Sequence, residues 1–107
     1  MEYFEIVHLR SYSQSDSNDA IEAFHQLTFP DKEKGFEDIT ILRDIILDSD
    51  LCICIRWHSG TPERGKSPLG LQLAAAFSGF GKINHSTWVK ENRVPIEIRR
   101  NDYEEQK

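Results

Sequence analysis

Histidine and arginine side chains at two-residue spacing could bind an anionic small molecule. They occur in three alternating stretches, with His8 and Arg10 in the first, Arg56 and His58 in the second, and His85 in the third. Residues two apart on a strand share one face, so these side chains can converge on a single layer of a sheet. Arginine and protonated histidine bind carboxylates and phosphates through charge-assisted hydrogen bonds. The competing interpretation pairs each side chain separately, at a strand end or in a subunit interface.

Two tryptophans lie close to these residues, Trp57 directly before His58 and Trp88 three residues after His85. A flat ligand could stack on an indole, and we therefore add Trp88 to the candidate ligand-binding residues. The alternative for both indoles is packing in the core or in a subunit interface.

Cysteine and histidine side chains also raise the question of a metal site. Cys52, Cys54, His58 and His85 are of the types that bind zinc. A Cys-x-Cys pair on one strand lacks the loop spacing of a zinc knuckle, and the chain has no second cysteine pair. Two cysteines at that spacing are also poorly placed to bond to each other. We therefore predict no metal, no cofactor and reduced thiols, as in a cytoplasmic protein.

Composition narrows the class of protein further. The 107 residues are enough for one domain, and the 38% hydrophobic and 29% charged residues are typical of a globular chain. A net charge of −5 argues against a nucleic-acid partner, which favours a basic face. No apolar run approaches the length of a membrane span, and the acidic, alternating start is unlike a signal peptide.

The first half of the chain predicts strand, helix and hairpin. Residues 2–12 alternate as a strand, and Ser17 or Asn18 is the expected N-cap of a short helix that ends before Pro30. Residues 36–47 and 51–58 are rich in β-branched residues and are separated by a short polar turn, which favours an antiparallel hairpin. The alternative, a helix over 38–47, would also space its apolar residues correctly.

The second half predicts a helix followed by a strand. Ser67 and Pro68 form a typical helix start, with a serine N-cap and proline at the first helical position. Gly81 fits the left-handed position after the helix, and residues 82–89 alternate as a strand. We place the domain boundary after residue 91, leaving 92–107 as an arm. Within it, 94–99 forms an edge strand, reaches across to a partner subunit, or lies as an extended segment on the surface.

The resulting order, strand–helix–strand–strand–helix–strand, predicts an α+β ferredoxin-like βαββαβ sandwich with a four-stranded antiparallel sheet. Both helices then cover the same face of the sheet. The first three strands carry apolar residues on both faces, so the second face needs a cover as well. A second copy of the chain is the simplest cover, and we expect a homodimer.

This element order, together with the ending Gly-Lys-Ile-Asn-His-Ser-Thr-Trp at 81–88, resembles the dimeric α/β-barrel superfamily over residues 1–90. The superfamily includes stress-responsive barrel proteins and antibiotic-biosynthesis-type monooxygenases. The resemblance implies two facing sheets, with ligands inside the barrel or between each sheet and its helices. It also leaves two functions open: a small binding protein for an anionic or aromatic ligand, or a cofactor-independent monooxygenase-like enzyme. Some members oxidise polycyclic or haem substrates with Asn, Trp and His side chains.

Overall fold

The computed structural model describes residues 2–29, 33–58 and 65–91. Its elements are β1 (Tyr3–Ser11), α1 (Gln14–His25), β2 (Phe36–Arg43), β3 (Asp50–Trp57), α2 (Pro68–Phe77) and β4 (Gly81–Val89). The strands form one sheet in the order β2-β3-β1-β4, and every neighbouring pair is antiparallel. The predicted ferredoxin-like sandwich is confirmed.

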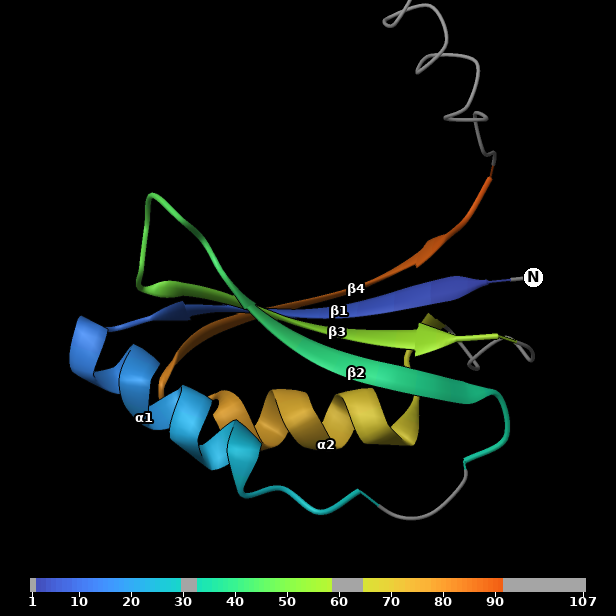
Figure 1. Ribbon diagram of the computed structural model, residues 1–107, viewed down its shortest axis with the longest axis horizontal. Coiled ribbons are helices and arrows are strands. Elements are labelled where there is room, and N and C mark those ends of the chain that lie inside the picture. The colour runs from blue at the N-terminus through green and yellow to red at the C-terminus, as the bar shows by residue number, and fades with distance from the viewer. Residues whose placement is uncertain (1, 30–32, 59–64, 92–107) are drawn as a thin grey trace, which may run out of the picture.

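Both helices pack on the same face of the sheet, as Figure 1 shows. The helix-facing side chains come from the odd-numbered positions of the strands, because successive side chains point to opposite faces. The buried apolar core consists of Val7, Leu9, Ala20, Leu51, Ile53, Ile55, Trp57, Leu69, Leu73 and Phe77. Each large side chain that is fully buried contributes about 1.5–3 kcal/mol relative to exposure in water.

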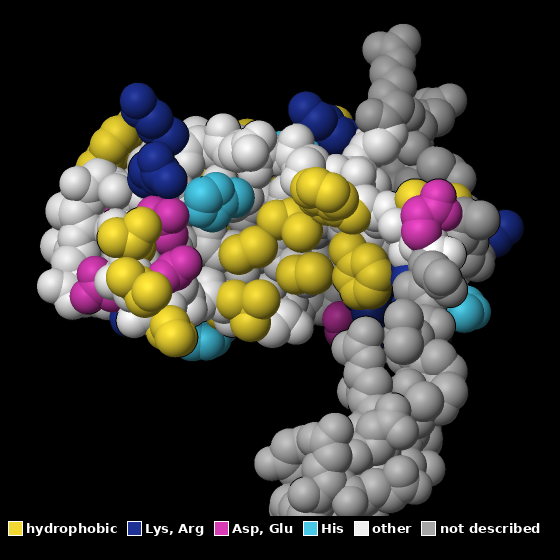
Figure 2. All heavy atoms as spheres, turned by 90° about the horizontal axis from the view of Figure 1, so that it is seen from above, with side chains coloured by type: hydrophobic (Ala, Val, Ile, Leu, Met, Phe, Trp, Pro, Cys, Tyr) yellow, Lys and Arg dark blue, Asp and Glu magenta, His cyan; other side chains and the backbone are white. Residues whose placement is uncertain are grey.

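Neither of the two described helices covers the opposite face of the sheet, which we call the open face. Its side chains come from the even-numbered positions. Apolar groups gather at its centre, as Figure 2 shows. The apolar and thiol side chains of the open face are Phe4, Ile6, Leu42, Cys52, Cys54 and Trp88. Leu42 and Trp88 are 53% and 61% exposed.

The first helix begins earlier than the sequence predicted. Its N-cap is Ser13, whose hydroxyl accepts a hydrogen bond from the Asp16 amide at 3.0 Å. The predicted caps, Ser17 and Asn18, lie inside the helix. Ser17 is fully buried and its hydroxyl donates to the Asp48 carbonyl at 2.9 Å. This serine therefore ties α1 to the β2–β3 hairpin instead of capping the helix.

The start of α2 is confirmed, with Ser67 as the N-cap and Pro68 at the first position. The predicted role of Gly81 is wrong: the helix ends at Phe77, and Gly81 opens β4 without a positive φ. A methyl group on Gly81 would lie 2.1 Å from the backbone oxygen of Arg10. Glycine is needed there because β4 approaches β1 so closely.

The β2–β3 hairpin is confirmed, and the alternative helix over residues 38–47 is wrong. The strand ends at Arg43, shorter than predicted, because the Asp44 carboxylate accepts the amides of Ile46 and Leu47 and so closes a turn. These two hydrogen bonds lower the pKa of Asp44. The segment 94–99 and the domain boundary after residue 91 lie at or beyond the end of the described residues.

Candidate functional site

A glutamate lies in the middle of the helix-facing core. Glu5 occupies an odd-numbered position of β1, beside Val7, and its exposed fraction is 0%. A buried carboxylate is costly unless hydrogen-bond donors replace the lost water. The residues around Glu5 must therefore supply these donors.

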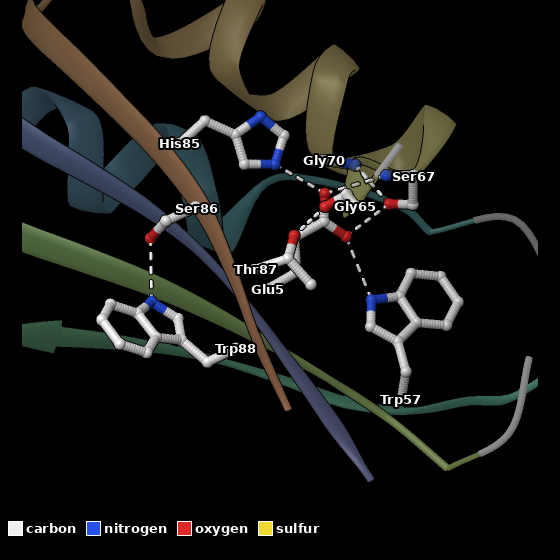
Figure 3. Close-up of polar contacts among 9 residues, drawn as sticks. All are labelled: Glu5, Trp57, Gly65, Ser67, Gly70, His85, Ser86, Thr87 and Trp88. Carbon is white, nitrogen blue, oxygen red and sulfur yellow. Dashed lines mark hydrogen bonds and ion pairs between the residues drawn. The ribbon is translucent and has the colours of Figure 1, made fainter. Parts of the chain in front are cut away.

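Four donors converge on Glu5 from three other elements, as Figure 3 shows. Trp57 Nε1 donates to Oε1 at 3.0 Å from β3. Ser67 donates twice at the start of α2, from its hydroxyl to Oε1 at 2.6 Å and from its amide to Oε2 at 3.0 Å. His85 Nε2 on β4 lies 2.6 Å from Oε2. We call Glu5, Trp57, Ser67 and His85 together the Glu5 cluster. A carboxylate offers about four acceptor positions, so the cluster satisfies Glu5 fully.

The second helix can approach this cluster only because residue 70 is glycine. A methyl group on Gly70 would lie 1.8 Å from Glu5 Oε2 and 2.8 Å from His85 Nε2. The Gly70 amide donates to the Ser67 hydroxyl at 2.9 Å, which completes the helix cap. Glu5 thus lies at the positive end of the α2 dipole, where a carboxylate is stabilised.

The Glu5–His85 pair has the chemistry of an oriented acid–base couple. A carboxylate that holds one imidazole nitrogen fixes the tautomer and the direction of the ring, as in hydrolase triads. The His85 side chain is 5% exposed, whereas that of Glu5 is not exposed at all. Of the two groups, only His85 reaches the surface, so any proton exchange with a ligand would pass through it.

A second polar region lies on the open face. His8 Nε2 is 3.3 Å from Asp50 Oδ2, and Arg10 Nε is 3.6 Å from Asp50 Oδ1. Two hollows adjoin His8. The first, of about 370 Å³, is lined by His8, Arg10, Lys82, Ile83 and Asn84. The second, of about 230 Å³, is lined by His8, Leu42, Arg43, Asp44, Asp50, Leu51 and Cys52.

The predicted single layer of histidines and arginines is divided between the two faces. β1 and β4 are neighbours, as expected, but His8 pairs with Asn84 whereas His85 pairs with Val7. His8 and Arg10 therefore share the open face, and His85 faces the helices. The convergence of His85 with His8 is wrong, because their register positions differ by one residue. Ligand binding by any of these side chains remains a prediction.

Arg56 lies on the open face, at the far end from Arg10. Its guanidinium lies 2.6 Å from Asp38 and 3.7 Å from Glu2, and Lys90 lies 2.9 Å from Glu2. The hydrogen bond to Asp38 raises the pKa of Arg56, and the bond from Lys90 lowers the pKa of Glu2. These four side chains form one ladder of alternating charge across the sheet.

Two other predicted residues, His58 and Trp88, lie apart from both polar regions. His58 is at the end of β3, with its side chain 68% exposed and 3.8 Å from Glu37. The Trp88 indole lies on the open face and donates to the Ser86 hydroxyl at 3.0 Å. Trp57 packs edge-on against Phe36 in the core. Both cysteines are free, and no group of three or more potential metal ligands exists among the described residues.

Sequence reasoning missed Glu5, Gly70, Lys82 and Asn84. One signal for Glu5 was available, because it shares the odd positions of β1 with Val7 and other apolar residues. A charged residue in such a set is either exposed to solvent or buried with hydrogen-bond or ion-pair partners. Which of the two applies depends on where α2 lies, and sequence periodicity does not fix that position.

No protein-family model matches the chain, and no curated protein matches it. Several solved structures do match the fold of this chain. SnoaB, a cofactor-independent oxygenase from Streptomyces nogalater, superposes with a TM-score of 0.56 at 16% identity, covering 88% of this chain and 97% of its own. A protein assigned as an antibiotic biosynthesis monooxygenase from Chloroflexus aurantiacus has a TM-score of 0.56 at 17% identity, and the match covers 90% of this chain and 99% of that protein. A further such protein from Bordetella bronchiseptica has a TM-score of 0.55 at 10% identity, with 85% of this chain and 98% of that protein covered.

The chain has the fold of the antibiotic biosynthesis monooxygenases. This confirms the resemblance inferred from the element order, at the level of the fold. At these identities the likeness carries no residue roles, and one fold supports many activities. Among the described residues, neither helix is long and apolar enough to cross a membrane.

Proposed function

We propose that this chain works as a homodimer whose facing sheets enclose a binding site for a small anionic or aromatic molecule. The observation that supports it is the open face. Apolar side chains occupy the centre of that face, and charged groups lie at both ends, around Asp50 and around Arg56. An apolar centre with a polar rim is the usual anatomy of a protein interface.

The apolar surface extends beyond the sheet. Ile45 and Ile46, at the tip of the β2–β3 hairpin, are 99% and 83% exposed. In Figure 1 this hairpin curves away from the helices, toward the side of the open face. Covering one leucine-sized side chain contributes about 1.5–3 kcal/mol, so several together give a substantial driving force for association.

The test compares two leucines of equal exposure on opposite sides of the molecule. Leu42 on the open face is 53% exposed, and Leu71 on the outer side of α2 is 51% exposed. Size-exclusion chromatography with light scattering should give twice 12.4 kDa for the wild type and for Leu71→Asp. Leu42→Asp should give a folded monomer. A monomeric wild type, or equal behaviour of the two variants, would contradict the homodimer.

The ligand class follows from the side chains around the open face. The hollow lined by His8, Arg10 and Lys82 is basic, although the whole chain carries a net charge of −5. The exposed indole of Trp88 offers a stacking surface at the other end of β4. Acidic overall charge disfavours nucleic acid as the partner. The free thiols of Cys52 and Cys54 fit a reducing compartment such as the cytoplasm.

A cofactor-independent oxygenase is the second candidate. It is favoured by the fold shared with SnoaB and by the Glu5–His85 pair, which could accept a proton from the acidic methylene group of a polycyclic ketone. Oxygen uptake with a tricyclic anthrone, in buffer with EDTA and without flavin or haem, tests it. An enzyme should consume oxygen above the uncatalysed rate and lose that activity in His85→Gln. Uptake equal to the protein-free control would exclude this activity on that substrate class.

A further inference from the structure

Two cations lie directly opposite each other on the open face. Arg10 of β1 and Lys82 of β4 are register partners in the antiparallel pair, so their side chains leave the sheet on the same side. Like charges at directly opposite positions repel and destabilise a sheet. This repulsion is unexpected in a chain with 18 acidic and 13 basic residues.

Neighbouring side chains neutralise the positive charge of Arg10 and Lys82 only in part. Asp50 lies 3.6 Å from Arg10 Nε and 3.3 Å from His8 Nε2, so one carboxylate serves both. Lys82 makes no ion pair with any side chain in the described ranges. Arg43 and Asp44 border the hollow on the other side of His8. The Arg43 guanidinium, however, donates to side chains of α1, and the Asp44 carboxylate accepts two amides of the hairpin turn. The lining of the 370 Å³ hollow therefore carries two permanent positive charges, and the Lys82 ammonium has no counter-ion among the described side chains.

The adjacent register pair adds two further polar groups. His8 and Asn84 are opposite each other, one layer along the same face, and both line the 370 Å³ hollow with Arg10 and Lys82. A guanidinium, an ammonium, an imidazole and an amide thus surround one space. Arginine and lysine both form charge-assisted hydrogen bonds with carboxylate and phosphate oxygens.

We propose that this hollow binds a small organic anion, with its carboxylate or phosphate group between Arg10 and Lys82. His8 and Asn84 then hydrogen-bond the polar part of the same molecule. The volume lies in the range typical of small-molecule sites, about 300–1,000 Å³, and exceeds what a bare inorganic ion fills. This inference deepens the proposed binding function, but the anion contacts come from one chain and do not require the second subunit.

The experiment measures binding of inorganic phosphate and of benzoate by isothermal titration calorimetry at low salt. Lys82→Gln removes the cation without a counter-ion, and Lys90→Gln removes an equal charge from the end of the same strand. Loss of one charge-assisted contact should weaken binding by about 10- to 100-fold. We expect this loss for Lys82→Gln and an unchanged affinity for Lys90→Gln.

A second measurement separates binding from stability. In salt-free buffer, Lys82→Gln should be at least as stable as the wild type, because it removes repulsion from Arg10. Phosphate or benzoate should then raise the melting temperature of the wild type but not of Lys82→Gln. Absence of binding to both probes, or equal losses in Lys82→Gln and Lys90→Gln, would overturn the anion site.

The same titration in Leu42→Asp distinguishes this inference from the proposed dimer. If that monomeric variant still binds phosphate or benzoate, the anion site is supported by itself. A wild type that is a monomer yet binds the anion would refute the dimer and keep the site. A dimer that binds neither probe would refute the site and keep the dimer.

Discussion

Replacing Gly70 by alanine should make this protein unfold at a much lower urea concentration than the wild type. In an ordinary helix interior the change would stabilise by about 1 kcal/mol, because alanine has the higher helix propensity. Here the new methyl group would lie 1.8 Å from Glu5 Oε2, 2.5 Å from Glu5 Cδ and 2.8 Å from His85 Nε2. None of these atoms can move freely, because both side chains are held by the cluster.

The cost can be worked from the contacts that must break. Ordinary contact begins at about 3.4 Å, so the helix or the carboxylate must move by roughly 1.6 Å. A displacement of that size breaks the 2.6 Å contact to His85 and at least one bond from Ser67. Hydrogen bonds to a charged group contribute about 1.5–3 kcal/mol each. After the gain in propensity, we expect a net loss of about 2–5 kcal/mol.

The chain provides a matched control for this experiment. Gly79, between α2 and β4, has no atom within 4 Å of the position that a methyl group would take. Urea unfolding followed by far-ultraviolet circular dichroism, at pH 7 and one protein concentration, compares the two alanine variants. The indole N–H resonance of Trp57 should shift only in Gly70→Ala. Equal stability of the two variants, with an unmoved resonance, would show that Gly70 has no special role in the Glu5 cluster.

Other substitutions test the same contacts. His85→Ala leaves a buried carboxylate short of one partner and should cost about 3–5 kcal/mol in urea unfolding; an unchanged midpoint would contradict this. Ser67→Ala should lower the free energy of unfolding by about 2–4 kcal/mol, whereas Ser13→Ala, which removes an exposed helix cap, should lower it by about 1 kcal/mol. Burial raises the pKa of Cys52 and Cys54. Their iodoacetamide labelling at pH 8 should be slower in the native protein than in urea, and stability should fall as pH rises above about 8.5, where unfolded thiols ionise first.

Alternation along the strands was readable from the sequence, and the direction of each face was not. In β1 the two sets of side chains both contain apolar residues, with Phe4 and Ile6 in one and Val7 and Leu9 in the other. Periodicity places Glu5 and His8 on opposite sides but does not say which side meets a helix. The predicted cluster of histidines and arginines was divided for this reason.

The glycines also show what a sequence pattern does not reveal about tertiary contacts. Gly35 lies in the turn before β2 and has a φ of 88°. Gly81 was expected at a positive φ, but its φ is not positive. What requires glycine at positions 70 and 81 is the closeness of another segment, Glu5 in one case and the backbone of Arg10 in the other. Closeness between distant segments leaves no local pattern.

The sequence by itself determined the order of the strands and helices, the hairpin and the capped start of α2, because these depend on residues close together in the chain. Only the tertiary structure decided that Glu5 is buried against the start of α2 and that Arg10 lies opposite Lys82. Glu5 and His85 are 80 residues apart, and Arg10 and Lys82 are comparably distant. Contacts over such separations are set by sheet register and helix packing, which depend on the whole core rather than on neighbouring residues.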